Sequence, residues 1–128
     1  MRFLLDTHVV IWWVDQDRLL SVPAHEAIAD PQNELNVSAA TIWEIAIKTG
    51  IGKLKLSRPY RDWMNQAISD LRAKILPISV DYSHAQTSLP PHHGDPFDRL
   101  LVAQSIVEQV SIISSDVAFD SYGVNRLW

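Results

Sequence analysis

The sequence predicts an α/β domain with a mostly parallel sheet. Short apolar runs with the length of buried strands alternate along the chain with longer segments of helical character. The chain has 128 residues, and 47% of them are hydrophobic, which is enough for one packed core. Alternating strands and helices are typical of a parallel sheet covered by helices. We therefore expect residues 1–128 to form one domain of this class.

The expected strands are short and mostly apolar. The first, residues 2–6, reads Arg-Phe-Leu-Leu-Asp and ends at a polar residue, as a buried strand does. A proline at position 77 places the third strand at an edge or near a strand end. The other expected strands cover residues 35–37, 75–78, 110–113 and 124–128.

The expected helices have clear start signals. Ser38 can cap a helix that stops near Gly50, and Asp95 can cap one with Pro96 at its first position. Both of these helices are apolar nearly all round, which predicts that they are mostly buried. The expected helices cover residues 9–14, 23–30, 39–49, 60–74, 82–88 and 96–109, with a short one near 114–120.

Composition excludes several classes of protein. The absence of Cys excludes disulfides and thiolate metal sites. No apolar run approaches the ~18 residues that span a bilayer, and the N-terminus lacks a secretory signal, so we expect a cytoplasmic protein that does not enter the membrane. A net charge of −4 argues against a protein that coats nucleic acid through charge alone. It does not exclude an enzyme that meets phosphate through bound cations.

Basic residues gather between positions 48 and 61. This segment is interpreted either as a solvated loop and helix start or as a surface that contacts RNA phosphates. The residues are Lys48, Lys53, Lys55, Arg58 and Arg61.

Four acidic residues occupy positions that suggest a common site. Asp6 ends the first strand and Asp116 follows the strand at 110–113, so both lie at the carboxyl edge where α/β sheets bind ligands. Glu44 and Asp98 lie on the two apolar helices, where a carboxylate needs a partner because an unpaired buried charge is unfavourable. An all-oxygen cluster favours Mg²⁺ or Mn²⁺ over Zn²⁺.

Each acid also has an ordinary structural interpretation. Asp6 can form an Asx turn, and Glu44 can pair with Lys48 one helical turn away. Asp95, Asp98 and Asp116 can cap helices or favour their N-termini, and Asp120 is a further acid nearby. The occurrence of four such acids together favours a metal site over independent caps.

Four segments resemble the acidic motifs of PIN domains, and more narrowly those of the VapC toxins of bacterial type II toxin–antitoxin pairs. They occur in the family's order along the whole chain, and the Asp-Pro-Phe-Asp-Arg-Leu-Leu block is the most specific. The segments are Leu-Leu-Asp-Thr-His at 4–8, Trp-Glu-Ile-Ala at 43–46, the stretch 95–104 that opens with this block, and Ser-Ser-Asp at 114–116, followed by a similar chain end at 122–128.

The resemblance implies a three-layer α/β/α sandwich and a metal-dependent endoribonuclease that uses Mg²⁺ or Mn²⁺ and leaves a 5′-phosphate and a 3′-hydroxyl. Its partners would be an RNA substrate, a cognate antitoxin protein and a second copy of the chain in a homodimer. Asp98, rather than Asp95, matches the third motif because it lies five residues before Ala103. The implied catalytic and metal-binding residues are Asp6, Glu44, Asp98 and Asp116, with Thr7 and Ser114 in support.

Two other functions are considered. In a non-catalytic protein-interaction module, the acids would be helix caps and salt bridges only. A phosphotransfer enzyme with Asp6 as nucleophile is disfavoured, because a phosphatase needs a second Asp where His8 stands and a receiver domain needs a late Lys, whereas none follows Lys74.

Aromatic residues and the histidine pair give weaker expectations. The five tryptophans are expected mostly in the core, but we expect either Trp12 or Trp13 to lie at an interface, because adjacent helical positions point in different directions. His92 and His93 lie in a proline-rich loop and are interpreted as solvated.

Overall fold

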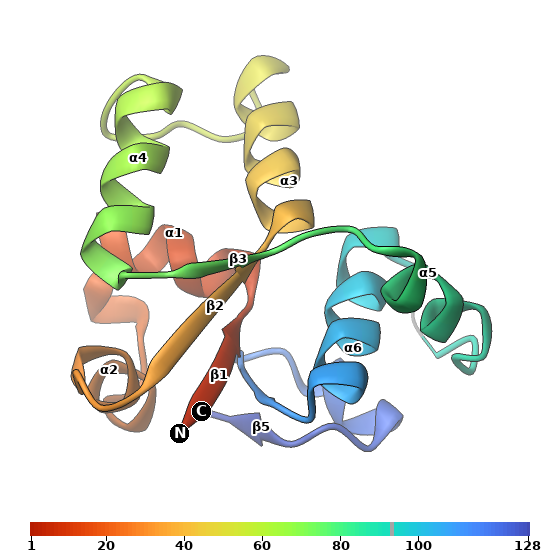
Figure 1. The fold of residues 1–128 in the computed structure, drawn as a ribbon. Helices are drawn as coiled ribbons and strands as arrows, with labels where there is room; N and C mark the ends of the chain where they lie inside the picture. Colours follow the sequence, from red (N-terminus) through yellow and green to blue (C-terminus); the bar gives the residue numbers. More distant parts are fainter. Residues whose placement is uncertain (93) are drawn as a thin grey trace.

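The computed structural model describes residues 1–92 and 94–128. Its five strands pair in parallel in the order β3-β2-β1-β4-β5, with β1 in the centre (Figure 1). The expected parallel sheet is thereby confirmed. The strands are β1 (Arg2–Leu5), β2 (Glu34–Ser38), β3 (Lys74–Leu76), β4 (Ser111–Ile113) and β5 (Arg126–Leu127).

Helices connect these strands, and α3 and α6 begin where the sequence indicates. The Ser38 hydroxyl accepts the Ala40 amide at 3.0 Å, and Asp95 accepts the amides of Phe97 and Asp98. The helices are α1 (Thr7–Asp15), α2 (Val22–Ala29), α3 (Ala39–Gly50), α4 (Tyr60–Leu71), α5 (Val80–Thr87) and α6 (Pro96–Glu108), with the short 3₁₀ helices η1 (Asp17–Leu19) and η2 (Val117–Tyr122).

Several expected helix boundaries are wrong by two or three residues, since α1 begins at Thr7 rather than 9, α5 at Val80 rather than 82 and η2 at Val117 rather than 114. The helix predicted over residues 60–74 ends at Leu71, because Arg72 adopts a left-handed conformation with φ of 48°. A left-handed residue at this point is a common way to end a helix. Lys74 then belongs to β3, where it pairs with Asn36 of β2.

The sheet separates two hydrophobic clusters, as expected for a sandwich of three layers. Phe3 and Leu5 of β1 join the cluster beneath α1 to α4, whereas Leu4 between them joins the cluster beneath α5, α6 and η2. This alternation follows from the two faces of a strand. Figure 1 shows the two groups of helices on opposite sides of the sheet.

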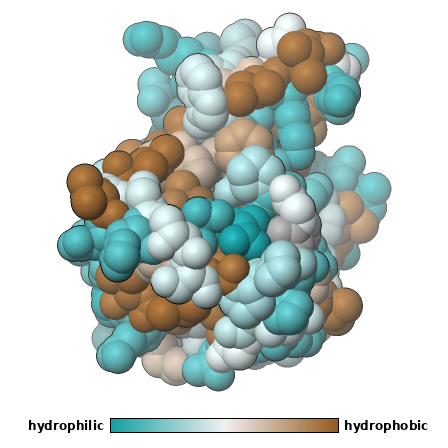
Figure 2. Space-filling model, turned by 90° about the vertical axis from the view of Figure 1, so that its right-hand side faces the viewer, coloured by the Kyte–Doolittle hydropathy of each residue, from teal (hydrophilic) through white to brown (hydrophobic). Residues whose placement is uncertain are grey.

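Helix α3 is less buried than its sequence suggests. Glu44 and Ile45 face the interior, but Trp43 is 62% exposed and Ile47 and Ile51 are exposed on later turns. The prediction that this helix is mostly buried is therefore wrong. Hydrophobic residues are also visible on the upper surface in Figure 2, at the height where Figure 1 places the end of α3.

The tryptophans divide between core and surface. Trp63 is fully buried, so the core expectation is right for this residue and wrong for Trp43. Trp12 and Trp13 are both half-buried, and the placement of one of them at an interface stays a prediction. His92 is exposed, as expected, and its ring contacts Tyr122, whereas His93 lies outside the described residues.

No helix in the described part of the chain is long and apolar enough to cross a membrane.

Candidate functional site at the carboxyl edge of the sheet

The centre of the site lies where β1 and β4 end side by side. Leu5 pairs with Ile113, so the residues that follow, Asp6 and Ser114, emerge at the same edge. The Ser114 hydroxyl donates to Asp6 Oδ2 at 2.7 Å and accepts the amide of Asp116 at 3.0 Å. Asp6 is only 4% exposed. Ser114 therefore supports Asp6 and connects it with Asp116.

Glu44 enters the same region from α3. The Thr7 hydroxyl donates to Glu44 Oε1 at 2.7 Å and lies 3.0 Å from the Thr41 hydroxyl, which is placed to donate to it in turn. Lys48 Nζ donates to Glu44 Oε2 at 2.6 Å. Thr7 thus supports Glu44 through its side chain, although its position in sequence suggested support for Asp6.

Asp98 stands in the first turn of α6. Burial raises its pKa to about 7, together with the negative charges of Asp95, Asp6, Glu44 and Asp116. A carboxyl group responds to neighbouring charges in this way only when they lie close by in a poorly solvated setting. The charges of Asp95, Asp6, Glu44 and Asp116 therefore all act on the Asp98 carboxyl group at the start of α6.

Burial also raises the pKa of Asp6, and the charge of Asp116 acts in the same direction. The hydrogen bond from Ser114, the charge of His8 and the backbone of Thr7 oppose this change. The fold thus shields Asp6 from water, which disfavours its charged form, and also supplies hydrogen bonds that stabilise this charged form.

Two acids that were ambiguous in the sequence differ in their surroundings. Asp95 caps α6 through the Phe97 amide at 2.8 Å, yet its charge also acts on Asp98. Asp120 is paired with Arg126 at 2.9 Å, and its side chain is 53% exposed. Asp95 therefore lies within reach of the site electrostatically, whereas Asp120 forms a surface ion pair. Asp116 also caps η2 through the Ala118 amide.

Lys48 supplies a positive charge to this acidic region. The hydrogen bond with Glu44 raises the pKa of Lys48, and the charges of Asp95 and Asp98 add to the effect. The ordinary interpretation of Glu44 and Lys48 as an i,i+4 pair is therefore right. Their burial is unequal, because the Glu44 side chain is 4% exposed and the Lys48 side chain 39%.

The side chains that could hold a metal ion here are the carboxylates of Asp6, Glu44, Asp98 and Asp116. Among the described residues, no three His, Cys, Asp or Glu side chains already stand as a ready-made metal-binding group. Their chemistry nevertheless suits a hard divalent cation, since every candidate ligand is a carboxylate. A cation would also relieve the repulsion that raises the pKa of Asp98.

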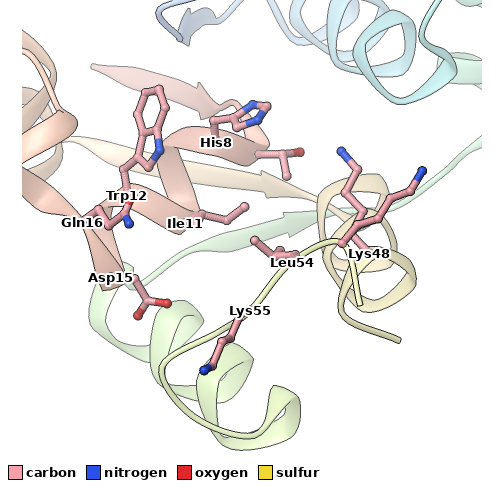
Figure 3. Close-up of a pocket in the computed structure, with 10 residues that line it drawn as sticks. His8, Ile11, Trp12, Asp15, Gln16, Lys48, Leu54 and Lys55 are labelled. Carbon is pink, nitrogen blue, oxygen red and sulfur yellow. The ribbon is translucent and has the colours of Figure 1, made fainter. Parts of the chain in front are cut away.

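A groove leads away from this acidic region between α1 and the segment after α3 (Figure 3). Its volume is about 420 Å³, and Lys48, Lys53 and Lys55 line one side of it. Arg58, which was grouped with these lysines in the sequence, is not among its lining residues and donates to Gln66 at 3.4 Å.

Two contributors were missed from the sequence. Thr41 lies three residues before Glu44 and therefore on the same side of α3, which is the signal that could have identified it. Asp15, at the end of α1, accepts hydrogen bonds from the Ser57 amide and hydroxyl and from the Trp63 indole. Nothing in the sequence near Asp15 indicates those distant donors.

The fold and the acidic edge together define a class of protein. A family model for the PIN domain matches residues 3–125, and the chain belongs to the PIN-domain family. Within that family it is similar to Ribonuclease VapC22 of Mycobacterium tuberculosis (strain ATCC 25618 / H37Rv), with 31% identity over 114 residues, 88% of this chain and 85% of the relative. The resemblance to the VapC toxins is thereby confirmed.

Solved structures share this architecture at low sequence identity. The VapBC2 complex from Rickettsia felis, bound to a DNA fragment from its promoter, contains a chain that matches with a TM-score of 0.76 and 14% identity, over 99% of this chain and 98% of that one. VapBC-1 from nontypeable Haemophilus influenzae matches with a TM-score of 0.65 and 14% identity, over 99% and 97%. These structures confirm the fold.

Proposed function

We propose that the chain is a metal-dependent endoribonuclease of the VapC type, which hydrolyses RNA phosphodiesters with Mg²⁺ or Mn²⁺ held by four carboxylates. The observation that carries this proposal is the environment of half-buried Asp98, whose pKa is raised by burial and by the charges of four other acids. The name of the M. tuberculosis relative, a ribonuclease, supports the same activity. The proposed ligands and catalytic residues are Asp6, Glu44, Asp98 and Asp116.

The residues of the chain have distinct roles in this proposal. Asp6 and Asp98 are the main ligands, while Glu44 and Asp116 complete the ligand set or orient water. When bound, the cation supplies a more acidic water and neutralises charge on the phosphate. Ser114 holds Asp6 through its 2.7 Å hydrogen bond, and Thr7 holds Glu44 in the same way. Such supporting hydrogen bonds fix the direction in which a carboxylate presents its oxygens.

Basic residues beside the acids would attract the RNA backbone. Lys48 lies at the boundary between the acidic region and the groove, and Lys53 and Lys55 continue along it. Arg58 lies further along the chain and would contact RNA outside the groove. Cationic side chains concentrate a polyanion near an otherwise acidic protein of net charge −4.

We also propose that the chain acts in the cytoplasm and binds two protein partners, a cognate antitoxin and a second copy of itself. The related solved structures include one described as a toxin–antitoxin complex from Klebsiella pneumoniae. Trp43 and Ile47 of α3 and Ile51, which follows the end of this helix, are exposed apolar residues that a protein partner could cover.

Metal titration tests the proposal against the alternative of a non-catalytic interaction module. The helix caps formed by Asp95 and Asp116 are consistent with that alternative. Mn²⁺ should bind the metal-stripped protein at millimolar concentration or below in calorimetry, and Asp98→Asn should lose this binding. Asp120→Asn is the matched control, because Asp120 is paired with Arg126 outside the acidic region. Equal binding by both variants, or none by the wild-type protein, would favour the interaction module.

An RNA cleavage assay follows the titration. Asp6→Asn should abolish cleavage while the thermal melting curve still reports a folded protein. Cleavage by purified Asp6→Asn at the wild-type rate would remove Asp6 from the mechanism.

A further inference from the structure

The groove beside the acidic region has two chemically different walls. One wall belongs to α1 and carries Ile11 and Trp12, and the other carries the side chains of Lys53, Leu54 and Lys55. Figure 3 shows Trp12 and His8 on the first wall and Leu54 and Lys55 on the second. A cavity of about 420 Å³ lies within the range of ~300–1,000 Å³ that is typical of small-ligand sites.

The lysine wall is held in place by the core. In the sequence Lys-Leu-Lys-Leu at 53–56, both leucines pack against the main hydrophobic cluster, which turns Lys53 and Lys55 outward. Neither lysine has an ion-pair partner among the residues that the structure describes. Asp15 fixes the next residue, Ser57, through both its amide and its hydroxyl. The two ammonium groups are therefore presented along the groove and available to an anion.

The α1 wall offers an aromatic surface. The rings of His8 and Trp12 are 5.8 Å apart, and the rings of Trp12 and Trp128 are also 5.8 Å apart, so the three rings form a row. Trp12 is half-buried and lines the groove. A planar base could extend this row by contact with the exposed part of the Trp12 ring.

An aromatic ring opposite cations is the combination that binds single-stranded nucleic acid, because bases stack on the ring while phosphates meet the cations. The groove also begins at Thr7, whose hydroxyl donates to Glu44 of the acidic region. A strand lying in it would thus continue directly into the proposed cleavage site. The lysines favour a phosphate backbone over an apolar peptide as the occupant.

We propose that this groove binds the nucleotide next to the cleaved phosphodiester in a single-stranded RNA, with an unpaired base on Trp12 and backbone phosphates at Lys53 and Lys55. This inference rests on the proposed ribonuclease function and deepens it. What it adds is the assignment of the groove residues, Trp12 for the base and Lys53 and Lys55 for the phosphates.

The test measures binding of a fluorescein-labelled single-stranded RNA hexamer to the full chain by anisotropy, with EDTA present so that no cleavage occurs. Trp12→Ala should weaken binding roughly tenfold, in keeping with the loss of one stacked base. Trp43→Ala is the matched control, because Trp43 is exposed on α3 away from the groove, and it should bind like the wild-type protein.

The lysines are tested through salt dependence. Exchange of both Lys53 and Lys55 for Gln should lower the slope of log K against log salt by roughly 1.4, since each phosphate contact of a single strand contributes about 0.7. Lys74→Gln, on β3 outside the groove, should leave the slope unchanged. If Trp12→Ala melts early, Trp12→Leu and the lysine pair still test the groove.

Three results would overturn the inference: wild-type affinity in the Trp12 variants, an unchanged salt slope in the lysine pair, or equal affinity for a duplex of the same sequence. Failure of the ribonuclease proposal looks different. In that case the wild-type protein would cut no RNA with Mn²⁺ present, whereas the effects of Trp12→Ala and of the lysine pair on hexamer binding would remain.

Discussion

Removal of the Lys48 ammonium separates its two roles, as partner of Glu44 and as competitor of a metal ion. The change is Lys48→Met, which keeps the length of the side chain and removes its charge. Glu44 is buried with a side chain 4% exposed, but Lys48 is 39% exposed. Loss of a partner costs about 3–5 kcal/mol in a fully buried pair, whereas exposed pairs one helical turn apart contribute about 0.3–0.5 kcal/mol. The unequal burial places the expected loss of unfolding free energy at about 1–2 kcal/mol.

The same variant should bind Mn²⁺ more tightly. In the metal-free protein Lys48 Nζ lies 2.6 Å from Glu44 Oε2, an oxygen that a metal ion would require. A cation must displace the ammonium in the wild-type protein but not in Lys48→Met, and a difference of about 1 kcal/mol corresponds to roughly fivefold in affinity.

Two measurements on metal-stripped protein check this prediction, a urea denaturation curve and a calorimetric Mn²⁺ titration, with Lys74→Met as the control on β3. Lower stability together with tighter metal binding is the expected pair of results. Mn²⁺ affinity that is unchanged or weaker in a folded Lys48→Met protein would refute the reasoning, because Glu44 would then not be a ligand for which Lys48 competes.

Three further predictions concern stability. The metal-free protein should lose unfolding free energy between about pH 4 and pH 7, because the pKa of Asp98 is raised to about 7 in the folded chain from 3.8, so the folded chain keeps a proton that the unfolded chain has already lost; urea curves that are flat or rising with pH in this range would contradict this. Asp15→Ala should cost about 2–3 kcal/mol by leaving three donors without an acceptor, and Asp15→Asn less, as measured by urea denaturation. Gln109→Gly should raise the unfolding free energy by about 0.5–1 kcal/mol, because Gln109 ends α6 in a left-handed conformation with φ of 55°, which glycine adopts more easily. Val107→Gly, inside the same helix, should lower it by about 1 kcal/mol. A change of the same sign in both variants would contradict this reasoning.

The fold was largely predictable because its elements follow local rules. The caps at Ser38 and Asp95 and the apolar strand before Asp6 depend on neighbours within a few residues, and all three are present as predicted. The exposure of Trp43 was not predictable in this way. Residues of α3 that look equally apolar differ in burial only because the sheet and α4 cover one side of the helix and leave the other open.

The site was predictable in its members but not in its contacts. Strand ends and apolar helices identified Asp6 and Glu44, and parallel sheets bring strand ends to one edge. The sequence offers no rule that assigns the Thr7 hydroxyl to Glu44 rather than Asp6, because that choice depends on how α1 and α3 pack. The hydrogen bond from Trp63 to Asp15 joins residues 48 positions apart, so no local sequence pattern could predict it.

The pairing of β1 with β4 has a consequence for the chain while it is being synthesised. Asp6 is made well before its hydrogen-bond donor, because Ser114 follows 108 residues later in the chain. Until β4 has left the ribosome and inserted beside β1, the acidic edge lacks Ser114 and Asp116, because contacts so far apart in sequence form late. A nascent chain that stalls or is cut before this point therefore carries the first acidic residues without a working site. On the proposed function, RNA cleavage then begins only after β4 and Ser114 have been made.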